Sequence, residues 1–112
     1  MTNQQIIEYN ARQITLMEHQ IIFFRKKEID ANQFIHKIEA LSSWIQNPPD
    51  NWFDNIMQSI NRIEVIYSTA LAHEEDLTNE NLQKILQLVD KIEEQILWYK
   101  KNYLPPIDDE NY

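Results

Sequence analysis

The order of hydrophobic and polar residues predicts four amphipathic helices. In four stretches, apolar side chains recur at alternating steps of three and four residues, which places them on one face of an α-helix. The stretches cover about residues 3–27, 31–47, 50–74 and 79–103. The stripe of the third is the most regular, with Phe53, Ile56, Ile60, Ile63, Tyr67 and Ala70. No stretch alternates with a period of two, so we expect no strands.

Polar residues mark the expected starts of these helices. Thr2 or Asn3 can cap the first helix, since both types accept hydrogen bonds from free backbone N–H groups. Asp30 precedes the second, and Gln33 follows it at the spacing of a capping box. Thr78 is the expected cap of the fourth helix.

Short connections link the predicted helices. One of them, NPPD at residues 47–50, contains two prolines, which cannot continue a helix. Helices of about 17–25 residues are roughly 25–37 Å long, and none can bury its stripe alone. We therefore predict an all-α fold, an antiparallel up-down-up-down four-helix bundle forming one domain over residues 1–103. A three-helix domain whose first helix docks elsewhere is the main alternative. Residues 104–112 form a proline-containing acidic tail.

Composition supports this fold class and indicates in which cellular compartment the protein is expected. The 112 residues suffice for one domain, and they include no glycine and no cysteine. Tight β-turns need glycine, so its absence favours long helices. The lack of cysteine excludes disulfides and thiol chemistry and suits the cytoplasm. The first ten residues lack the pattern of a signal peptide, and no apolar run is long enough to span a bilayer. We expect a cytoplasmic protein without membrane contact.

Negative charge is concentrated in the second half of the chain. The net charge is −8, and residues 1–49 hold five acidic and five basic residues. Residues 50–112 hold thirteen acidic and five basic residues, which accounts for the whole surplus. Such a surface repels phosphate, so we expect no nucleic-acid partner. It either attracts a basic protein or only maintains solubility.

The connection between the third and fourth helices is especially acidic, with Glu74, Glu75, Asp76 and Glu80. Glu80 belongs to a first helical turn, where negative charge complements the helix dipole. The other three carboxylates follow the end of the preceding helix, where negative charge is mildly unfavourable. They are either a solvated turn or part of a surface for a basic partner.

Trp98 lies outside the apolar stripe of the fourth helix, near Asp90 and Glu94. An aromatic side chain flanked by carboxylates is typical of a binding hot spot for a basic protein. Alternatively, Trp98 packs against LPPI at residues 104–107. Trp52, beside the proline break, is expected to hold the start of the third helix against its neighbours.

Glu64 lies about 40° from Ile60 around the third helix, within the apolar stripe. A carboxylate there must reach solvent, find a donor or lose its charge. We expect a buried or half-buried hydrogen bond to an aromatic or histidine side chain of another helix. The functional alternative is a carboxylate within a pocket.

Residue patterns for catalysis or metal binding are nearly absent. No two histidines stand three or four residues apart; they are His19, His36 and His73. Asp90 with Glu93, or Asp50 with Asp54, could contribute to a magnesium site, but no second matching pair is present. We therefore expect no enzymatic activity, no metal and no cofactor, with a metal-dependent hydrolase as the remaining alternative.

A loose motif links the second and third helices to a known group of proteins. A helix ends at a proline break, a tryptophan opens the next helix, and Glu-Val-x-Tyr-x-x-Ala-Leu follows. Its residues here are Pro48, Pro49, Trp52, Glu64, Val65, Tyr67, Ala70 and Leu71. Over roughly Phe34–Ile96, the chain resembles small α-helical immunity proteins of bacterial polymorphic-toxin and contact-dependent growth-inhibition systems. The resemblance implies that Trp52, Glu64 and Tyr67 maintain the bundle.

The resemblance and the acidity together give the functional hypothesis. The resemblance implies a protein that binds one toxin domain, one to one, and covers its active site or docking surface. A nuclease toxin with a basic groove would suit the acidic surface. The candidate partner-binding residues are Glu74, Glu75, Asp76, Glu80, Asp90, Glu94 and Trp98. The alternative is a helical interaction or assembly subunit that forms a homodimer through leftover apolar surface.

Overall fold

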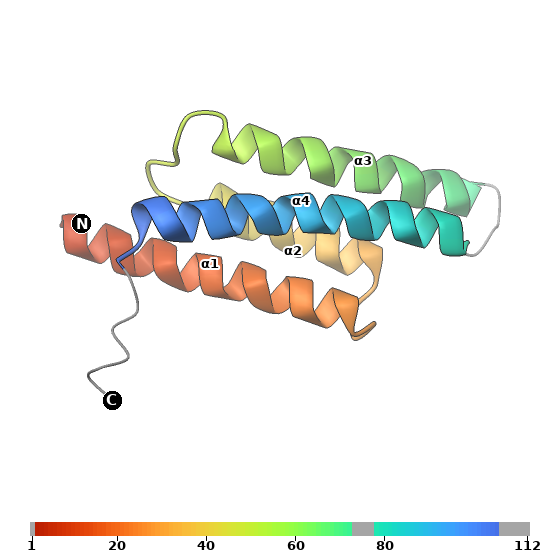
Figure 1. The fold of residues 1–112 in the computed structure, drawn as a ribbon, viewed down its shortest axis with the longest axis horizontal. Coiled ribbons are helices and arrows are strands. Elements are labelled where there is room, and N and C mark those ends of the chain that lie inside the picture. The colour runs from red at the N-terminus through yellow and green to blue at the C-terminus, as the bar shows by residue number, and fades with distance from the viewer. Residues whose placement is uncertain (1, 73–77, 106–112) are drawn as a thin grey trace.

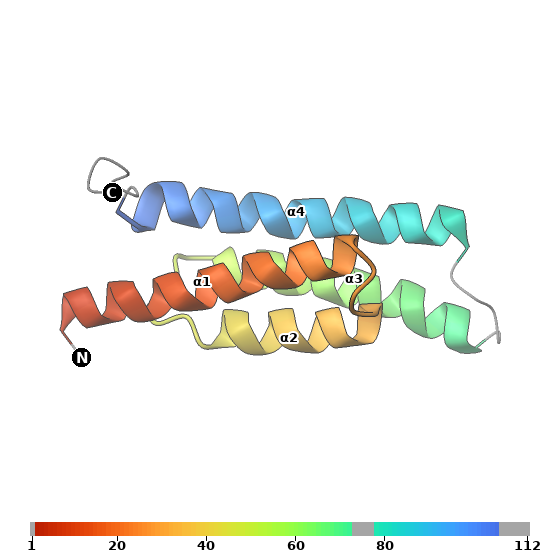
Figure 2. The same cartoon turned by 90° about the horizontal axis from the view of Figure 1, so that it is seen from below.

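Residues 2–72 and 78–105 are described by a computed structural model of the chain. They form four helices: α1 (Asn3–Arg25), α2 (Ala31–Ser43), α3 (Trp52–Ala72) and α4 (Asn79–Tyr103). Consecutive helices run in opposite directions (Figure 1). Each helix packs against two others, and α1 lies against both α2 and α4 (Figure 2). The all-α bundle is confirmed, and the place of α1 in this ring excludes the three-helix alternative.

Side-chain caps begin three of the helices as predicted. The Thr2 hydroxyl accepts from the Gln5 backbone N–H, and the Gln5 side chain accepts from the Thr2 backbone. Asp30 and Gln33 form the same reciprocal pair at the start of α2. Thr78 caps α4 by accepting from the backbone of the third residue after it. These contacts satisfy backbone donors that have no partner within their helices.

The connection between α2 and α3 is longer than predicted. The second helix ends at Ser43 rather than near residue 47, and the third begins at Trp52. Asn47 and Asn51 flank the proline pair with φ angles of 52° and 66°. Asparagine tolerates this left-handed region better than most residues, so it provides the sharp turns that glycine commonly provides.

One core fills the centre of the ring. All four helices contribute an apolar stripe to it, and burial of these stripes is the main force holding the bundle together. The most deeply buried large side chains are Phe34, Ile14, Met17, Ile21, Ile38, Trp52, Ile56, Ile60, Ile63, Ile85, Ile92 and Ile96. Among the described residues, no helix is both long enough and apolar enough to cross a membrane.

Glu64 is exposed, so the prediction of a buried or half-buried carboxylate is wrong. The buried residues of α3 are Trp52, Ile56, Ser59, Ile60, Ile63 and Ala70. At 100° per residue, the centre of this group lies about 100° from Glu64. Ile60 sits at one edge of the buried arc rather than at its centre. Closeness to Ile60 therefore did not place Glu64 inside the core.

A buried asparagine fixes the α2–α3 connection to the bundle. Asn10 of α1 is 4% exposed, and its Nδ2 donates to the backbone oxygen of Gln46 at 2.9 Å. Its Oδ1 accepts from the backbone N–H of Gln46 at 2.8 Å. Nδ2 also lies 3.0 Å from the hydroxyl oxygen of Tyr99. Burial raises the pKa of that hydroxyl, and the contact with Asn10 opposes the shift.

Trp52 fixes the start of α3 in the same region. Its side chain is 1% exposed, and its ring centroid lies 5.1 Å from that of Tyr99. Its Nε1–H donates to the backbone oxygen of Gln95 at 3.0 Å. The structural role predicted for Trp52 is confirmed, and α3 is thereby held against α4.

Gln13 of α1 is a buried polar residue whose side-chain oxygen is not hydrogen-bonded in the described part of the chain. Its side chain is 8% exposed, and its Oε1 has no hydrogen-bond partner in the described part of the chain. A buried acceptor without a donor is unfavourable. We expect Gln13→Leu to raise the free energy of unfolding by about 1–2 kcal/mol, measured by urea denaturation. Gln87→Leu at an exposed site of α4 is the control, and a less stable Gln13 variant would contradict this account.

Candidate functional site

The acidic residues singled out in the sequence do not form one continuous surface in the described structure. Glu74, Glu75 and Asp76 lie outside the described residues. Glu80 is exposed in the first turn of α4, where its Oε1 lies 3.5 Å from Nζ of Lys84. This exposed pair one turn apart is typical of a solvated helix face and contributes little to stability.

Asp90 faces α1 and is bound by a cation of the same chain. Nη2 of Arg25 lies 2.7 Å from Oδ1 of Asp90, and Nη1 lies 2.7 Å from Oε2 of Glu93. The hydrogen bonds to Glu93 raise the pKa of the Arg25 guanidinium, with a further contribution from Asp90. Part of the predicted negative surface is therefore balanced within the bundle. The possible magnesium pair, Asp90 and Glu93, instead holds a guanidinium group.

Glu94 and Trp98 lie together at a surface hollow between the start of α3 and the second half of α4. The hollow has a volume of about 460 Å³ and is lined by Asp50, Asn51, Trp52, Asn55, Glu94, Gln95 and Trp98. We call it the acidic hollow. Neither Asp50 nor Glu94 forms an ion pair with another described residue. Two uncompensated carboxylates thus border one concave site.

Trp98 forms an aromatic wall of the acidic hollow. It is 46% exposed, and its ring centroid lies 5.6 Å from that of Tyr103. Tyr103 in turn stacks on Tyr99 with a centroid distance of 5.3 Å. These contacts support the indole from one side and leave much of its surface accessible. The alternative in which LPPI packs on Trp98 involves residues 106 and 107, which lie outside the described range.

Hydrogen bonds of the buried residues Asn10 and Trp52 fix the backbone that carries the acidic hollow. Asn10 holds Gln46, and the Trp52 indole is bonded to the backbone of Gln95. Asp50 lies between these two anchored points of the chain. The left-handed turn at Asn51 then directs the chain into α3. The carboxylate of Asp50 is therefore brought to α4 by rigid neighbours, which reduces the ordering cost of binding.

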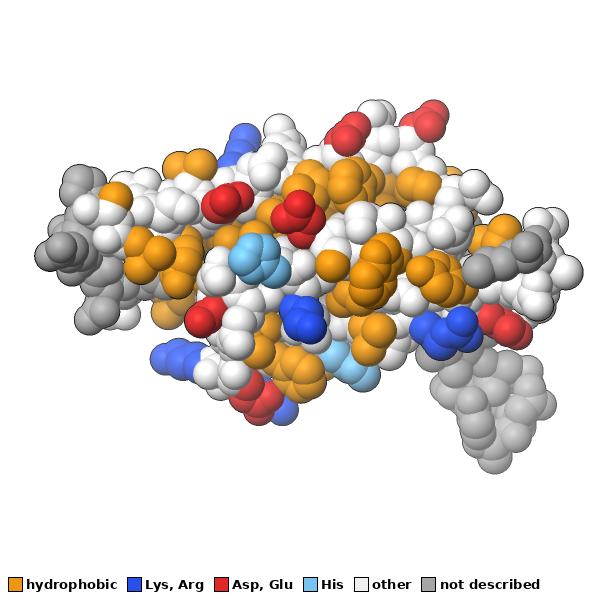
Figure 3. Space-filling view, turned by 180° about the vertical axis from the view of Figure 1, so that it is seen from behind, with side chains coloured by type: hydrophobic (Ala, Val, Ile, Leu, Met, Phe, Trp, Pro, Cys, Tyr) orange, Lys and Arg blue, Asp and Glu red, His pale blue; other side chains and the backbone are white. Residues whose placement is uncertain are grey.

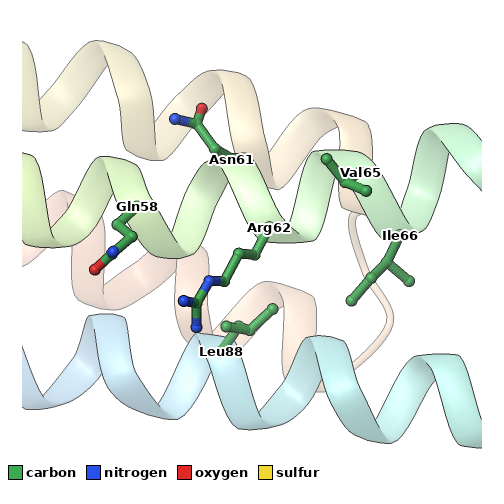
Figure 4. Close-up of a pocket in the computed structure, with 6 residues that line it drawn as sticks. All are labelled: Gln58, Asn61, Arg62, Val65, Ile66 and Leu88. Carbon is green, nitrogen blue, oxygen red and sulfur yellow. The ribbon is translucent and has the colours of Figure 1, made fainter.

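A second hollow follows along the same pair of helices (Figure 4). Its volume is about 480 Å³, and its lining residues are Gln58, Asn61, Arg62, Val65, Ile66 and Leu88. We call it the apolar hollow, since Val65, Ile66, Leu88 and the stem of Arg62 supply most of its wall. Val65 is 65% exposed. Exposed apolar surface of this kind often marks a binding site.

Sequence reasoning missed the apolar hollow and the contribution of Asp50 to the acidic hollow. Val65 and Arg62 lie on the side of α3 opposite its regular stripe, about 170° and 130° from the centre of that stripe at 100° per residue, and this position was the available signal. The role of Asp50 had no such signal because Glu94 is distant in sequence. On the face shown in Figure 3, acidic, basic and apolar side chains are mixed.

The side chains of the α3–α4 surface could bind two kinds of group. Carboxylates and an indole suit a cationic side chain, and the neighbouring apolar wall suits an aliphatic or aromatic one. In the described ranges, no group of three or more histidine, aspartate or glutamate side chains is arranged to hold a metal ion. Comparison of the chain with protein-family models, curated proteins and solved structures gives no match.

Proposed function

We propose that this protein binds a basic protein through the α3–α4 surface and acts without catalysing a reaction. The observation that carries the proposal is the acidic hollow, where Asp50 and Glu94 flank the exposed Trp98 without a cation from the described chain. A lysine or arginine of the partner would supply the positive charge that pairs with these carboxylates. The apolar hollow beside it would add burial of an uncharged side chain.

Electrostatics and aromatic contact support this choice of partner. A cation over an indole face gains about 0.5–2 kcal/mol, depending on how far it is removed from water. A net charge of −8 also speeds the encounter with a basic surface. Affinity would therefore come from a few central residues, and association rate from the overall charge.

The specific biological role that we propose is neutralisation of a bacterial toxin domain. Its support is the resemblance of the proline break and the motif from Trp52 to Leu71 to helical immunity proteins. A nuclease toxin needs a basic groove for its phosphate substrate, and an acidic surface can occupy such a groove. The partner would then be a basic toxin domain in a one-to-one complex, and the site of action would be the cytoplasm. The role predicts that a gene for a toxin domain lies beside the gene for this protein. Co-expression of that toxin domain with this protein tests the role, because growth should be restored.

The residues of the surface are tested by charge reversal. We expect Asp50→Lys/Glu94→Lys to weaken binding to that toxin domain by about 2–3 kcal/mol, or roughly 30- to 150-fold. The reason is that like charges would meet at the acidic hollow. Isothermal titration calorimetry measures the affinity, and circular dichroism checks that helicity is unchanged.

Glu39→Lys on α2 is a control for this experiment, since Glu39 is exposed and lies on a different helix. It changes net charge without touching the α3–α4 surface, and it should reduce the affinity by less than about threefold. Equal losses of affinity in the control and the double variant would mean that overall charge, and not the acidic hollow, determines binding. Unchanged affinity in the double variant would remove the acidic hollow from the interface.

A further inference from the structure

The first helix carries a second stripe on the side facing away from the core. Tyr9, Leu16 and Phe23 recur every seven residues. Arg12 and His19 lie between them on the same helical face, and Lys26 follows as the C-cap of α1. Leu16 is 43% exposed and Phe23 is 37% exposed. At 100° per residue, Leu16 and Phe23 lie about 110° and 130° from the centre of the buried residues of α1.

This outer stripe makes few contacts within its own chain. The ring of His19 lies 6.3 Å from that of Phe23, and Arg12 and Lys26 form no ion pair with another described residue. A surface hollow of about 350 Å³ borders the stripe, lined by Arg12 and Leu16 of the stripe and by Ala11 and Thr15 beside it. A helix with apolar residues outside its buried side has a second surface to bury.

The order of side chains along the stripe is self-complementary when two copies are antiparallel. With Leu16 of one copy opposite His19 of the other, Arg12 meets Phe23 and Tyr9 meets Lys26. Both latter pairs bring a cation to an aromatic ring. A parallel alignment would instead place Arg12 against Arg12 and Lys26 against Lys26.

Charge on the whole molecule also favours this surface for self-association. Two copies of a protein with net charge −8 repel each other. Residues 1–49, which contain α1, carry equal numbers of acidic and basic residues. Two copies that approach each other through α1 therefore avoid most of that repulsion. The α3–α4 surface lacks this property because the negative surplus lies in residues 50–112.

We propose that two copies of this protein associate through the outer stripe of α1, antiparallel and with a two-fold axis between residues 17 and 18. Such an interface uses the same residues of both copies, as two-fold symmetry requires. Among the described helices, α1 packs against α2 and α4 and not against α3. The dimer therefore leaves the groove between α3 and α4 accessible, and the proposal is independent of the toxin partner.

The first test is the molar mass in solution. We expect light scattering at rising protein concentration to show a mass approaching twice 13.6 kDa. Leu16→Glu/Phe23→Glu should restore the monomer mass at the same concentrations, because four carboxylates would face one another across the axis. Val65→Glu is the control, since it places a carboxylate in another exposed apolar region and should leave the dimer intact.

Cross-linking tests the orientation, and the absence of native cysteine makes it unambiguous. In the antiparallel pair, Arg12→Cys and Phe23→Cys of opposite copies adjoin, so the double variant should oxidise to a covalent dimer. Each single variant should not, because identical residues lie about 16 Å apart along the helix axis. Covalent dimers of the single variants would indicate a parallel pair and overturn the proposed register. A monomer at every concentration, or a dimer that survives Leu16→Glu/Phe23→Glu, would overturn the proposal itself.

Discussion

Replacing Trp52 with alanine is expected to lower the free energy of unfolding by about 3–5 kcal/mol, the range for large buried aromatic residues. The side chain is 1% exposed and packs at the junction of α3 and α4. Its removal leaves a cavity and also removes the hydrogen bond to the backbone oxygen of Gln95. Urea denaturation monitored by circular dichroism measures the loss, and the midpoint should fall without a large change in slope.

Trp44→Ala is the matched control for Trp52→Ala. Trp44 follows α2 directly and is 52% exposed, so its truncation should cost less than about 1 kcal/mol. Similar losses for the two variants would mean that Trp52 does not occupy the buried position described above. The contrast tests the packing of the α3 start without relying on any function.

Replacing Asn10 with alanine is expected to lower the free energy of unfolding by about 2–3 kcal/mol. One amide group makes two hydrogen bonds to the backbone of Gln46 and one contact with the Tyr99 hydroxyl. Alanine removes all of these and leaves the buried hydroxyl of Tyr99 without its partner. Thermal and urea unfolding would both report the loss.

Asn61→Ala is the control for Asn10→Ala, since Asn61 is exposed on α3 and should tolerate the change within about 0.5 kcal/mol. Combining Asn10→Ala with Tyr99→Phe tests the proposed contact directly. The two changes should be non-additive by more than about 0.5 kcal/mol, because each removes the same interaction. Additive losses would show that Asn10 and Tyr99 stabilise the bundle separately.

These two expected effects also concern the acidic hollow. Asn10 and Trp52 anchor the chain on either side of Asp50, and Trp52 itself lies partly beneath the hollow. The geometry of the proposed binding surface therefore depends on residues whose main contribution is to stability. A variant of either residue would be a poor choice for mapping the interface, because lost binding and lost folding would coincide.

Several features of the fold could be predicted because they depend on neighbours in sequence. The capping pair of Asp30 and Gln33 is three residues apart, and the stripe from Ile56 to Ala70 repeats at helical spacing. Local geometry alone brings such residues together, so the helices and most of their ends were predictable. The end of α2 at Ser43 was not predicted, and the connection after it contains left-handed turns at Asn47 and Asn51 on both sides of the prolines.

The candidate site was predictable only in part. Glu94 and Trp98 are one helical turn apart and were identified as neighbours, but their association with Asp50 required the packing of α3 on α4. Arg25 reaches Asp90 and Glu93 across 65 and 68 positions of sequence, and no local pattern indicates that pairing. The same limit applies to Glu64, whose exposure was decided by the direction in which α3 faces the core.

The sequence by itself determined that this chain forms capped amphipathic helices, that these must pack together, and that negative charge is carried by its second half. Periodicity, capping chemistry and composition are properties of short stretches, so they can be read without coordinates. Only the tertiary structure decided which carboxylates are neutralised by Arg25, which two border the acidic hollow, and which side of α1 remains uncovered. Those outcomes depend on distances between residues far apart in sequence, and these distances are fixed only when the four helices close around one core.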